Sequence, residues 1–488
     1  MLVNTTDQYG VLATTRYVPR LRLERSAILA QHQWMAPAAL RSLAKGRKAM
    51  ACWDEDSVTM AVEAGRQLCE AVPTAAAELT LTSTTVPFAE RLNAGIVAAA
   101  LGLAATAVLR DVGSSVRAAV SELGAALRRV PGGDAQMLLA AERRIARPAS
   151  VQEMLYGDGA AGAIVGTGAA IATFVASGST NADFVDRFRE AGADHAYAWE
   201  ERWVRDEGYM KIVAETIRAC LRDARVAPTE VAHFVMPAPP ARVSEAVAKR
   251  IGIDTSALVS TEHETVGDLG AAQPLAMLDQ ALRRAANGDL ILIAAFGSGC
   301  DVLLLRRTDR PCLGEVPDAG RPETSYLKHL AWSGQIDLDW GMRAEMDNKT
   351  AATAAWRDHA RVSRFEGGRC RSCGALQFPR GHICVNPDCR ERETQAPASL
   401  ADVPARVLSH TSDFLGYTLN PPFRFGQVDF EGGARVSMEF ADADSDELRV
   451  GTPVRMVYRV KDFDRQRMFR RYFWKATPVR GATKPGGS

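Results

Sequence analysis

Four cysteines that lie close together in the sequence have a spacing that specifies a chemistry. Cys370 and Cys373 form a C-x2-C pair, ten residues follow, and Cys384 and Cys389 form a C-x4-C pair. Two thiolate pairs of this kind can supply the four tetrahedral ligands of a structural Zn2+, and a small segment with few apolar residues can fold around such an ion. A catalytic zinc is disfavoured because four thiolates leave no open position. The sequence therefore predicts a structural zinc site at these four cysteines, with His382 as a nearby substitute ligand.

The other cysteines are scattered singly along the chain, which suits reduced thiols and not a disulfide framework. The N-terminal residues lack the basic stretch followed by an apolar stretch that marks a signal peptide, so we expect a cytoplasmic protein. The uncharged run from Gly159 to Asn181 is as long as a membrane helix, but Gly, Ala, Ser and Thr dominate it. We interpret this run as two buried strands joined by a glycine turn.

Length and charge narrow the class of protein. A chain of 488 residues exceeds what one hydrophobic core usually organises, so we expect two or three domains. The 59 Lys and Arg residues nearly balance the 58 Asp and Glu residues, and the net charge is +1. No strong overall field therefore favours a nucleic acid or an anionic membrane, and a polyanion must be recognised locally.

Short apolar runs alternate with longer amphipathic stretches over residues 9–307. Apolar residues at three- and four-residue spacing predict helices over 57–72 and 207–224. Continuous apolar runs predict buried strands over 232–237 and 289–299. This alternation indicates α/β layers. The order of helix, strand and glycine-rich turn recurs, which indicates two similar halves.

The C-terminal third of the chain has a different composition. Residues 308–325 are rich in Pro, Gly and charge, as is typical of a linker. We expect a helical connector over 326–362 and the zinc ribbon over 363–396. Apolar and polar residues alternate over 397–480, which predicts a small all-β domain, most simply a barrel. Residues 481–488 are expected to form a disordered tail.

Six stretches share their order and spacing with the motifs of a known enzyme family. They are YGVLATTRYVPRLRLERSAI, CWDEDSVTMAVEA, PFAERLNAGIVAAALGL, GDGAAGAIVG, VGDLGAAQPLAMLDQAL and FGSGCDVLLL. In these stretches the chain resembles the thiolase superfamily, and the nearest branch is the hydroxymethylglutaryl-CoA synthase and ketoacyl synthase III type. This resemblance implies a thiolase-like domain over 1–307 with a five-layered αβαβα fold. It also implies a homodimer and a narrow tunnel for the pantetheine arm of coenzyme A.

Residues 326–478 resemble the zinc-ribbon/OB-fold proteins that accompany thiolase-like enzymes as separate subunits, and YFWKATP is similar to their closing motif. The resemblance implies that residues 397–480 form an OB-fold. Together the two resemblances imply a coenzyme A thioester as substrate, and they leave open a second subunit as partner.

The residues that carry chemistry in thiolase-like enzymes are replaced in this sequence. Alignment of RAAVSEL with the family's RAGTSAL places Val116 at the nucleophilic cysteine and Ser115 one step away, and a shift of one residue would exchange them. The family's histidine and asparagine become Pro237 and Pro240, and the acidic residue of hydroxymethylglutaryl-CoA synthases becomes Thr84. A serine needs a base where a cysteine thiolate does not, so the usual covalent route loses its nucleophile.

Four side chains are candidates for a different but related reaction, retro-aldol cleavage of a β-hydroxyacyl-CoA. This reaction needs a base for the hydroxyl proton and stabilisation of an enolate, but no acyl-accepting cysteine. Each candidate also has a simpler interpretation, such as a turn cap, a charge at a helix end or a small packed residue. The candidates are Ser115, Glu90, His263 and Cys300.

Two tyrosines and one further serine are weaker candidates. Tyr156 and Tyr209 could supply a phenol, although both also fit buried ring packing. Ser298 lies with Cys300 in a glycine-rich loop that resembles an oxyanion element of the family.

Five residues are candidates for binding coenzyme A. One of them matches the arginine of the family motif HQANLRI, and three others form a local cluster of cations. Lysines and an arginine fork suit phosphates, and an indole ring could stack on adenine. A solvated basic loop is the alternative interpretation of the cluster. The five are Arg242, Lys45, Arg47, Lys48 and Trp53.

Three functions remain open from the sequence. The leading hypothesis is an acyl-CoA lyase or acyltransferase, most simply an aldolase. The second is a catalytically silent thiolase-like subunit that positions an active partner. The third is a nucleic-acid or protein adaptor built on the zinc ribbon and barrel, which would bind single strands with strong salt dependence.

Overall fold

The computed structural model describes residues 8–35, 38–72, 76–129, 134–239, 242–314, 320–340 and 351–480. The chain divides into two compact units: Met1–Ala51, Asp56–Ala98 and Leu103–Leu330 form the first, and Cys52–Glu55, Ala99–Gly102 and Ala331–Ser488 form the second. Within the described ranges no helix combines the length and the apolar character needed to cross a membrane. The predicted tail and parts of the predicted linker and connector lie outside these ranges, at 481–488, 315–319 and 341–350.

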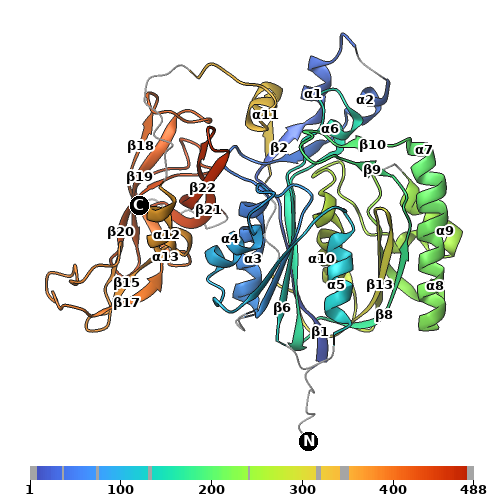
Figure 1. Ribbon diagram of the computed structural model, residues 1–488, viewed down its shortest axis with the longest axis horizontal. Coiled ribbons are helices and arrows are strands. Elements are labelled where there is room, and N and C mark those ends of the chain that lie inside the picture. Colours follow the sequence, from blue (N-terminus) through green and yellow to red (C-terminus); the bar gives the residue numbers. More distant parts are fainter. Residues whose placement is uncertain are drawn as a thin grey trace, which may run out of the picture. The chain divides into compact units, whose positions relative to one another are not determined.

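A nine-stranded mixed sheet runs through the first unit, in the order β11-β12-β13-β8-β1-β7-β6-β4-β5 (Figure 1). The predicted pair of strands within 159–181 is confirmed as β7 and β8, but only β7 is buried over most of its length, whereas β8 is mostly half-buried. The nine strands are β1 (Gln8–Tyr17), β4 (Glu78–Thr82), β5 (Val108–Val112), β6 (Gln136–Glu142), β7 (Gly159–Gly168), β8 (Ala172–Asn181), β11 (Val231–Val235), β12 (Leu290–Phe296) and β13 (Gly299–Arg307).

The strand order recurs in the two halves of this sheet. In the N-terminal half, β5, β4 and β6 are parallel, and β7 and β1 follow in antiparallel pairs. In the C-terminal half, β11 and β12 are parallel, and β13 and β8 follow in antiparallel pairs. An isolated parallel bridge between Phe234 and Leu258 lies where the counterpart of β5 would pair. The two halves meet at the antiparallel pair of β1 and β8.

Helices make three layers around the two half-sheets. α5 (Ala118–Leu127) and α10 (Gln273–Arg284) contact strands of both halves and lie between them (Figure 1). α3 (Ser57–Ala71) packs on β1, β6 and β7, whereas α8 (Ala214–Ala224) packs on β8 and β13. Buried residues of α5 and α10 share one apolar core with strands of both halves, and α8 and α9 (Val243–Ile251) share a second core with β11, β12 and β13. The expected five-layered αβαβα arrangement is confirmed.

The helix predicted over 207–224 is only partly an α-helix. α8 begins at Ala214, and the preceding residues form the π-helix η1 (Val204–Val213). A Cβ atom on Gly208 of η1 would lie 2.6 Å from the Phe296 ring, so a glycine permits this approach. The ring centroids of Tyr209 and Phe296 are 4.8 Å apart. Hydrophobic spacing does not distinguish the two helix types, although π turns often occur at functional sites.

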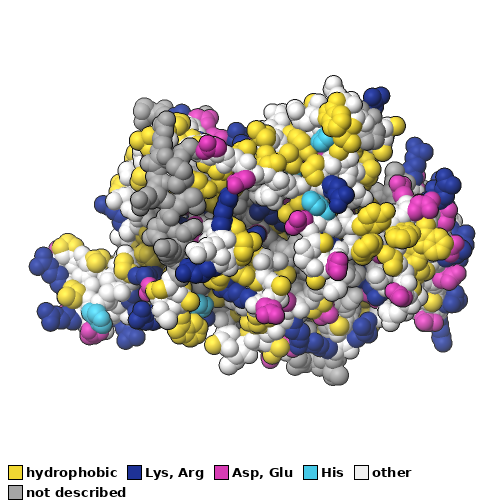
Figure 2. Space-filling model, turned by 45° about the horizontal axis from the view of Figure 1, so that its top comes forward, with side chains coloured by type: hydrophobic (Ala, Val, Ile, Leu, Met, Phe, Trp, Pro, Cys, Tyr) yellow, Lys and Arg dark blue, Asp and Glu magenta, His cyan; other side chains and the backbone are white. Residues whose placement is uncertain are grey.

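The surface before and within η1 carries exposed rings among ion pairs. Trp199 and Trp203 are about half exposed, and Lys211 pairs with Glu207 at 2.6 Å. Hydrophobic side chains interspersed with Lys, Arg, Asp and Glu are visible at the right of Figure 2. This segment is therefore an ion-paired surface of the first unit.

A small sheet of β14 (Arg321–Glu323), β2 (Leu21–Glu24) and β3 (Arg47–Met50) completes the first unit. The first unit also contains a two-stranded sheet of β9 (Arg187–Phe188) and β10 (Tyr197–Ala198). The shorter helices of this unit are α1 (Arg25–Gln31), α2 (Ala38–Leu43), α4 (Asn93–Leu101), α6 (Val151–Leu155) and α7 (Glu201–Trp203).

The second unit contains two sheets. The first consists of β16 (Leu376–Gln377), β15 (Glu366–Cys370) and β17 (Gln395–Ser399). The second is antiparallel, in the order β20 (Arg435–Glu439), β19 (Phe423–Phe430), β18 (Ala405–Asp413), β21 (Pro453–Asp464) and β22 (Phe469–Pro478). Ala441 N, just after β20, donates to Ala476 O of β22 at 2.9 Å, so the sheet curls until its outer strands meet. The all-β character is confirmed, and the OB-fold remains a prediction.

The predicted helical connector consists of three short helices in its described parts. They are α11 (Tyr326–Trp332), α12 (Ala352–Arg357) and α13 (His359–Ser363).

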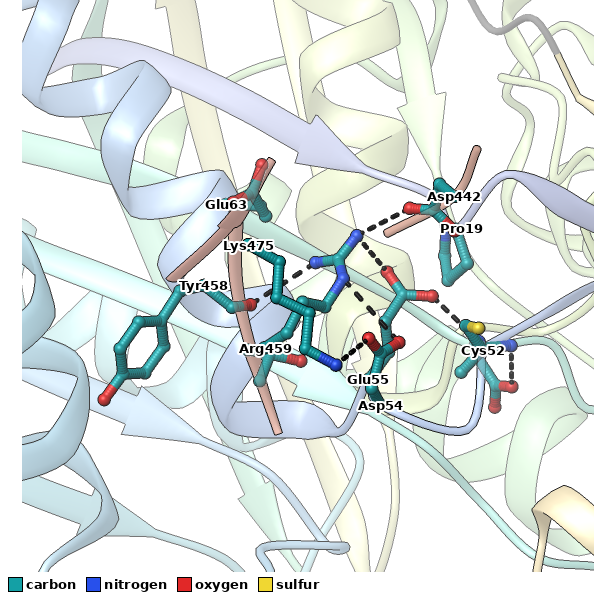
Figure 3. A network of polar contacts seen from close by, with 12 residues as sticks. Pro19, Cys52, Asp54, Glu55, Glu63, Asp442, Tyr458, Arg459 and Lys475 are labelled. Atoms are coloured by element: carbon teal, nitrogen blue, oxygen red, sulfur yellow. Dashed lines mark hydrogen bonds and ion pairs between the residues drawn. The ribbon is translucent and has the colours of Figure 1, made fainter. Parts of the chain in front are cut away.

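A buried ion network stabilises the second unit (Figure 3). The side chain of Arg459 is 1% exposed and lies 3.1 Å from a carboxylate oxygen of Glu55 and 2.8 Å from one of Asp442. Lys475 pairs with Asp54 at 2.9 Å, and Val460 N donates to Asp54 O. Residues 52–55 are thus held by β21 and β22, although they lie far from these strands in the sequence.

Candidate active site and zinc site

His263 lies in a turn whose main chain is attached to neighbouring segments of the first unit. Arg47 N of β3 donates to Glu264 O at 2.9 Å, and the Arg25 side chain donates to His263 O. These bonds hold the backbone at residues 263 and 264, so the candidate base has a defined position.

Asp268 is buried where two chain segments approach each other closely. Its N–H donates to Leu155 O at 2.7 Å, and its carbonyl accepts from Gly157 N at 3.0 Å. A Cβ atom on Gly267, whose φ is +88°, would lie 2.8 Å from Leu155 O, so glycine is required there. Asp268 was not predicted from the sequence. The signal that could have found it is the pair of glycines, Gly267 and Gly270, that flank this polar stretch.

Arg144 and Asp268 form a buried ion pair. Arg144 Nη2 lies 2.9 Å from Asp268 Oδ2, and the side chains are 5% and 8% exposed. The Arg144 guanidinium also lies 3.8 Å from the centroid of the Tyr156 ring, and Arg187 donates to the Tyr156 hydroxyl at 3.5 Å. Burial favours the protonated carboxyl, but Arg144 and His263 outweigh it and lower the pKa of Asp268 to about 2. Asp268 is therefore ionised at neutral pH.

The surroundings of His263 favour its neutral form. Burial lowers the pKa of the imidazole below its ordinary value; Asp268 opposes this shift, and Arg25 and Arg144 add to it. Nε2 is buried and finds no hydrogen-bond partner among the residues that the structure describes. A neutral imidazole with an unpaired nitrogen, in a buried polar cluster, can act as a general base.

Ser115 and Val116 precede α5, and the structure brings Ser115 to the glycine-rich loop between β12 and β13. Ser115 Oγ donates to Gly297 O at 3.1 Å. Two backbones here adopt the left-handed region, with φ of +71° at Ser114 and +50° at Ser298. Such conformations are uncommon for residues other than glycine, and they cluster at functional sites.

Cys300 follows this loop and is fully buried. Burial raises the pKa of its thiol to about 12, and Asp301 adds to the shift. A thiol that stays protonated at neutral pH is a poor nucleophile. The structure therefore favours the interpretation of Cys300 as a packed small residue.

A buried carboxylate lies beside the threonine that we aligned with the family's acidic residue. Glu142 is fully buried at the end of β6 and accepts hydrogen bonds from Thr84 N at 2.9 Å and from the Thr85 hydroxyl at 2.7 Å. Glu142 was not predicted from the sequence because it follows Thr84 by 58 residues. The candidate Glu90, in contrast, is exposed in the turn before α4.

The basic cluster proposed for coenzyme A divides into two environments. Lys45 is exposed, 3.8 Å from Glu264, and Arg47 is half-buried in β3, so both adjoin the turn that contains His263. Lys48 is buried and its Nζ donates to Glu153 O at 2.6 Å. Burial lowers the pKa of Lys48 to about 8. Lys48 is held inside the domain, which disfavours a role at phosphates.

Arg242 and Trp53 lie in other surroundings. Arg242 is exposed at the start of α9 with a φ of +60°. Trp53 belongs to the second unit, where Lys475 Nζ lies 4.4 Å from the centroid of its ring. Pro237 follows β11, whereas Pro240 lies outside the described residues.

The four cysteines of the predicted zinc site come together in the second unit. Their sulfur atoms all lie within 4.8 Å of one another, with Cys370 3.8 Å from Cys389 and Cys373 3.6 Å from Cys384. A tetrahedral Zn2+ with Zn–S bonds of about 2.3 Å separates its sulfurs by about 3.8 Å, so the four residues fit this ion.

His382 is not one of the clustered ligands. Its Nδ1 lies 2.9 Å from Glu393 Oε1 instead.

Comparisons with known proteins identify the kind of domain that contains His263 and Asp268. Residues 221–304 match the family 3-oxoacyl-[acyl-carrier-protein] synthase III, C-terminal. The hydroxymethylglutaryl-CoA synthase of Aeropyrum pernix is 26% identical over 354 residues, which cover 70% of this chain and 94% of that protein. The 3-oxoacyl-(acyl carrier protein) synthase III structure from Pseudomonas aeruginosa aligns with a TM-score of 0.53 at 18% identity, over 64% of this chain and all of that chain. The chain carries a thiolase-like domain.

A second solved structure agrees with this assignment of the fold. MvaS in complex with 3-hydroxy-3-methylglutaryl coenzyme A aligns with the thiolase-like domain at a TM-score of 0.52 and 17% identity, over 68% of this chain and 88% of that chain. This likeness concerns the fold of the domain.

The second unit has its own relatives. Residues 357–395 match the ChsH2 rubredoxin-like zinc ribbon. A DUF35 domain-containing scaffold protein of Methanothermobacter thermautotrophicus is 28% identical over 116 residues, which cover 22% of this chain and 83% of that protein. The thiolase-like domain is thus followed by a zinc ribbon in the same chain.

Proposed function

We propose that the protein cleaves β-hydroxyacyl-CoA thioesters by a retro-aldol reaction, without a covalent acyl-enzyme. The observation that carries the proposal is the unpaired, buried Nε2 of His263 beside the ionised Asp268. A thiolase-like site that has lost its cysteine but keeps a buried base is suited to aldol chemistry and not to Claisen chemistry.

In the proposed reaction, His263 takes the proton of the β-hydroxyl group. The bond between the α and β carbons breaks, the oxygen becomes the carbonyl of a released aldehyde or ketone, and the electron pair forms the enolate of the shortened thioester. The imidazolium then returns the proton to the α carbon, which gives a shorter acyl-CoA. Asp268 stabilises the imidazolium between these two proton transfers.

We assign Ser115 and the loop after β12 to the thioester end of the substrate. Ser115 Oγ lies 3.1 Å from Gly297 O, so its hydroxyl already faces this loop. It can donate to the oxygen on which negative charge develops in the enolate. Cys300 supports the loop as a buried neutral thiol, and Glu90 receives no role because it is exposed.

Lys45 and Arg47 are proposed to bind phosphates of coenzyme A, because both adjoin the turn that contains His263. Arg242 remains a further candidate for contacts to coenzyme A. The zinc ion, held by Cys370, Cys373, Cys384 and Cys389, supplies structure and takes no part in the reaction. We also propose that the protein is a cytoplasmic homodimer and that its second unit contains an OB-fold. A second subunit is proposed as a partner.

The proposal is tested by incubating the purified full chain with a series of β-hydroxyacyl-CoA thioesters and, separately, with β-ketoacyl-CoA thioesters plus free coenzyme A. We expect an aldehyde or ketone and a shorter acyl-CoA from the hydroxy substrates, and no thiolysis of the keto substrates. Binding without turnover of either series would favour the silent-subunit hypothesis. Absence of any binding would contradict the acyl-CoA function itself.

A further inference from the structure

Arg144 carries hydrogen-bond donors that the protein itself leaves unused. Its side chain is 5% exposed. Nη2 bonds to Asp268, but Nε and Nη1 are buried without a hydrogen-bond partner in the described part of the chain. These two nitrogens hold three N–H donors. Buried donors of a charged group that stay unsatisfied are costly, and native structures rarely leave them so.

The surroundings of Arg144 hold it rigidly in place. The Tyr156 ring lies 3.8 Å from the guanidinium, and a Cβ atom on Gly270 would lie 3.0 Å from its Cζ and Nε atoms. Glycine at position 270 therefore lets the guanidinium pack closely against this backbone. Arg144 is also close enough to His263 to lower the pKa of its imidazole. The unused donors thus adjoin the proposed base.

We infer that Arg144 binds a carboxylate on the acyl group of the substrate, so that the protein acts on acyl-CoA thioesters that carry a second acidic group. This inference rests on the proposed function and adds the class of its substrate. A carboxylate offers two oxygens with about four acceptor positions, which matches three donors of a permanent cation.

Two other anionic groups of the substrate match Arg144 less well. The phosphates of coenzyme A remain hydrated and are assigned to Lys45 and Arg47 near the surface, whereas Arg144 is buried. The enolate oxygen forms only transiently and is assigned to Ser115. If the enolate oxygen were the acceptor, the three N–H donors of Arg144 would stay unsatisfied until the reaction begins. A carboxylate that is present in the ground state satisfies them as soon as the substrate binds.

The test compares two unreactive ligands of equal chain length, glutaryl-CoA and valeryl-CoA, by calorimetric titration of the full chain. They differ only in a terminal carboxylate or methyl group. We expect glutaryl-CoA to bind at least about tenfold more tightly, as a charged hydrogen bond in a buried site implies. Arg144→Gln should abolish this preference by weakening glutaryl-CoA alone. Arg144→Lys should keep part of it because the charge remains.

A matched control removes an equal charge elsewhere in the first unit. Arg306→Gln changes an exposed arginine that donates to Gly288 O, and it should leave both affinities unchanged. The Arg144→Lys variant keeps the test decisive if Arg144→Gln fails to fold beside the buried Asp268.

Two results would overturn the inference. Equal affinity of the wild type for the two ligands would mean that water alone satisfies the donors of Arg144. An equal loss for both ligands in Arg144→Gln and Arg144→Lys would mean a structural or oxyanion role. Failure of the proposed function is separate: cleavage of neutral β-hydroxyacyl-CoA thioesters without this preference would keep that function and remove only the subsite.

Discussion

Arg144 Nη2 lies 2.9 Å from a carboxylate oxygen of Asp268, and both charges of this ion pair act on the pKa of His263. The arginine keeps Asp268 ionised at neutral pH, whereas burial and the nearby arginines keep His263 neutral. The thiolase-like domain therefore contains an ionised carboxylate and a neutral imidazole within one buried cluster. Such a pair can accept a proton and stabilise the resulting cation without any cysteine.

Replacing His263 by glutamine should lower kcat/KM for β-hydroxyacyl-CoA cleavage by about 10²–10³-fold, because the reaction loses its general base. KM should change little, since the amide keeps the size of the side chain. Steady-state kinetics with aldehyde detection measure both quantities. The matched control is His410→Gln, which changes an exposed histidine of the second unit and should leave the rate unchanged. A variant of His263 with wild-type kcat/KM would remove this residue from the mechanism.

The pH dependence of activity should follow the lowered pKa of His263. The base is active when neutral, so kcat/KM should be constant near pH 7 and should fall only as the pH drops below 6.5, the ordinary pKa of histidine. Because the folded state binds this proton more weakly than the unfolded state, the stability from His263 is present above pH 6.5 and declines as the pH falls. A pH–rate profile checks the first statement. An acidic limb that begins above pH 7 would point to another base.

Replacing Cys300 by alanine should leave the cleavage rate within about threefold of the wild type, because a thiol whose pKa is raised to about 12 is not the nucleophile. The cost should appear in stability, since a buried side chain is shortened by one atom. Activity and thermal unfolding measured on one preparation separate the two effects. Loss of activity with unchanged unfolding would restore a catalytic role to Cys300.

Removing one zinc ligand should destabilise the second unit. Cys373→Ser breaks the cluster of four sulfur atoms, so the bound zinc measured by atomic emission should fall from about one ion per chain to a small fraction. Unfolding of the second unit should then occur at a lower temperature. Cys312→Ser, outside the cluster, should retain the metal. Full zinc content in the Cys373 variant would contradict the proposed ligand set.

The ion network around Arg459 should be a large contributor to the stability of the second unit. Arg459→Met removes the buried cation that the carboxylates of Glu55 and Asp442 contact, and we expect a loss of about 3–5 kcal/mol in the free energy of unfolding of this unit. Arg435→Met removes an exposed pair with Asp429 and should cost about 0–1 kcal/mol. Denaturant titration measures both. Similar losses in the two variants would show that burial adds nothing to the network.

The sequence predicted the layers and the zinc site because both follow local patterns. The apolar run of β12 and the C-x2-C and C-x4-C spacing each lie within a short stretch of chain. Glu142 and Arg144 were missed because they act on residues more than fifty positions away, at Thr84 and Asp268. The burial of Lys48 was likewise hidden, since a lysine that follows two other cations gives the same local pattern whether it is exposed or buried.

The most direct test of a cysteine-free carbon–carbon lyase is one rapid-quench experiment on the wild-type chain with a β-hydroxyacyl-CoA substrate. It measures the released aldehyde and shorter acyl-CoA together with the mass of the intact protein during the first turnover. We predict equal amounts of the two products and a protein mass that never increases. An acylated protein that forms and decays during turnover, or a complete absence of aldehyde, would contradict the proposed reaction.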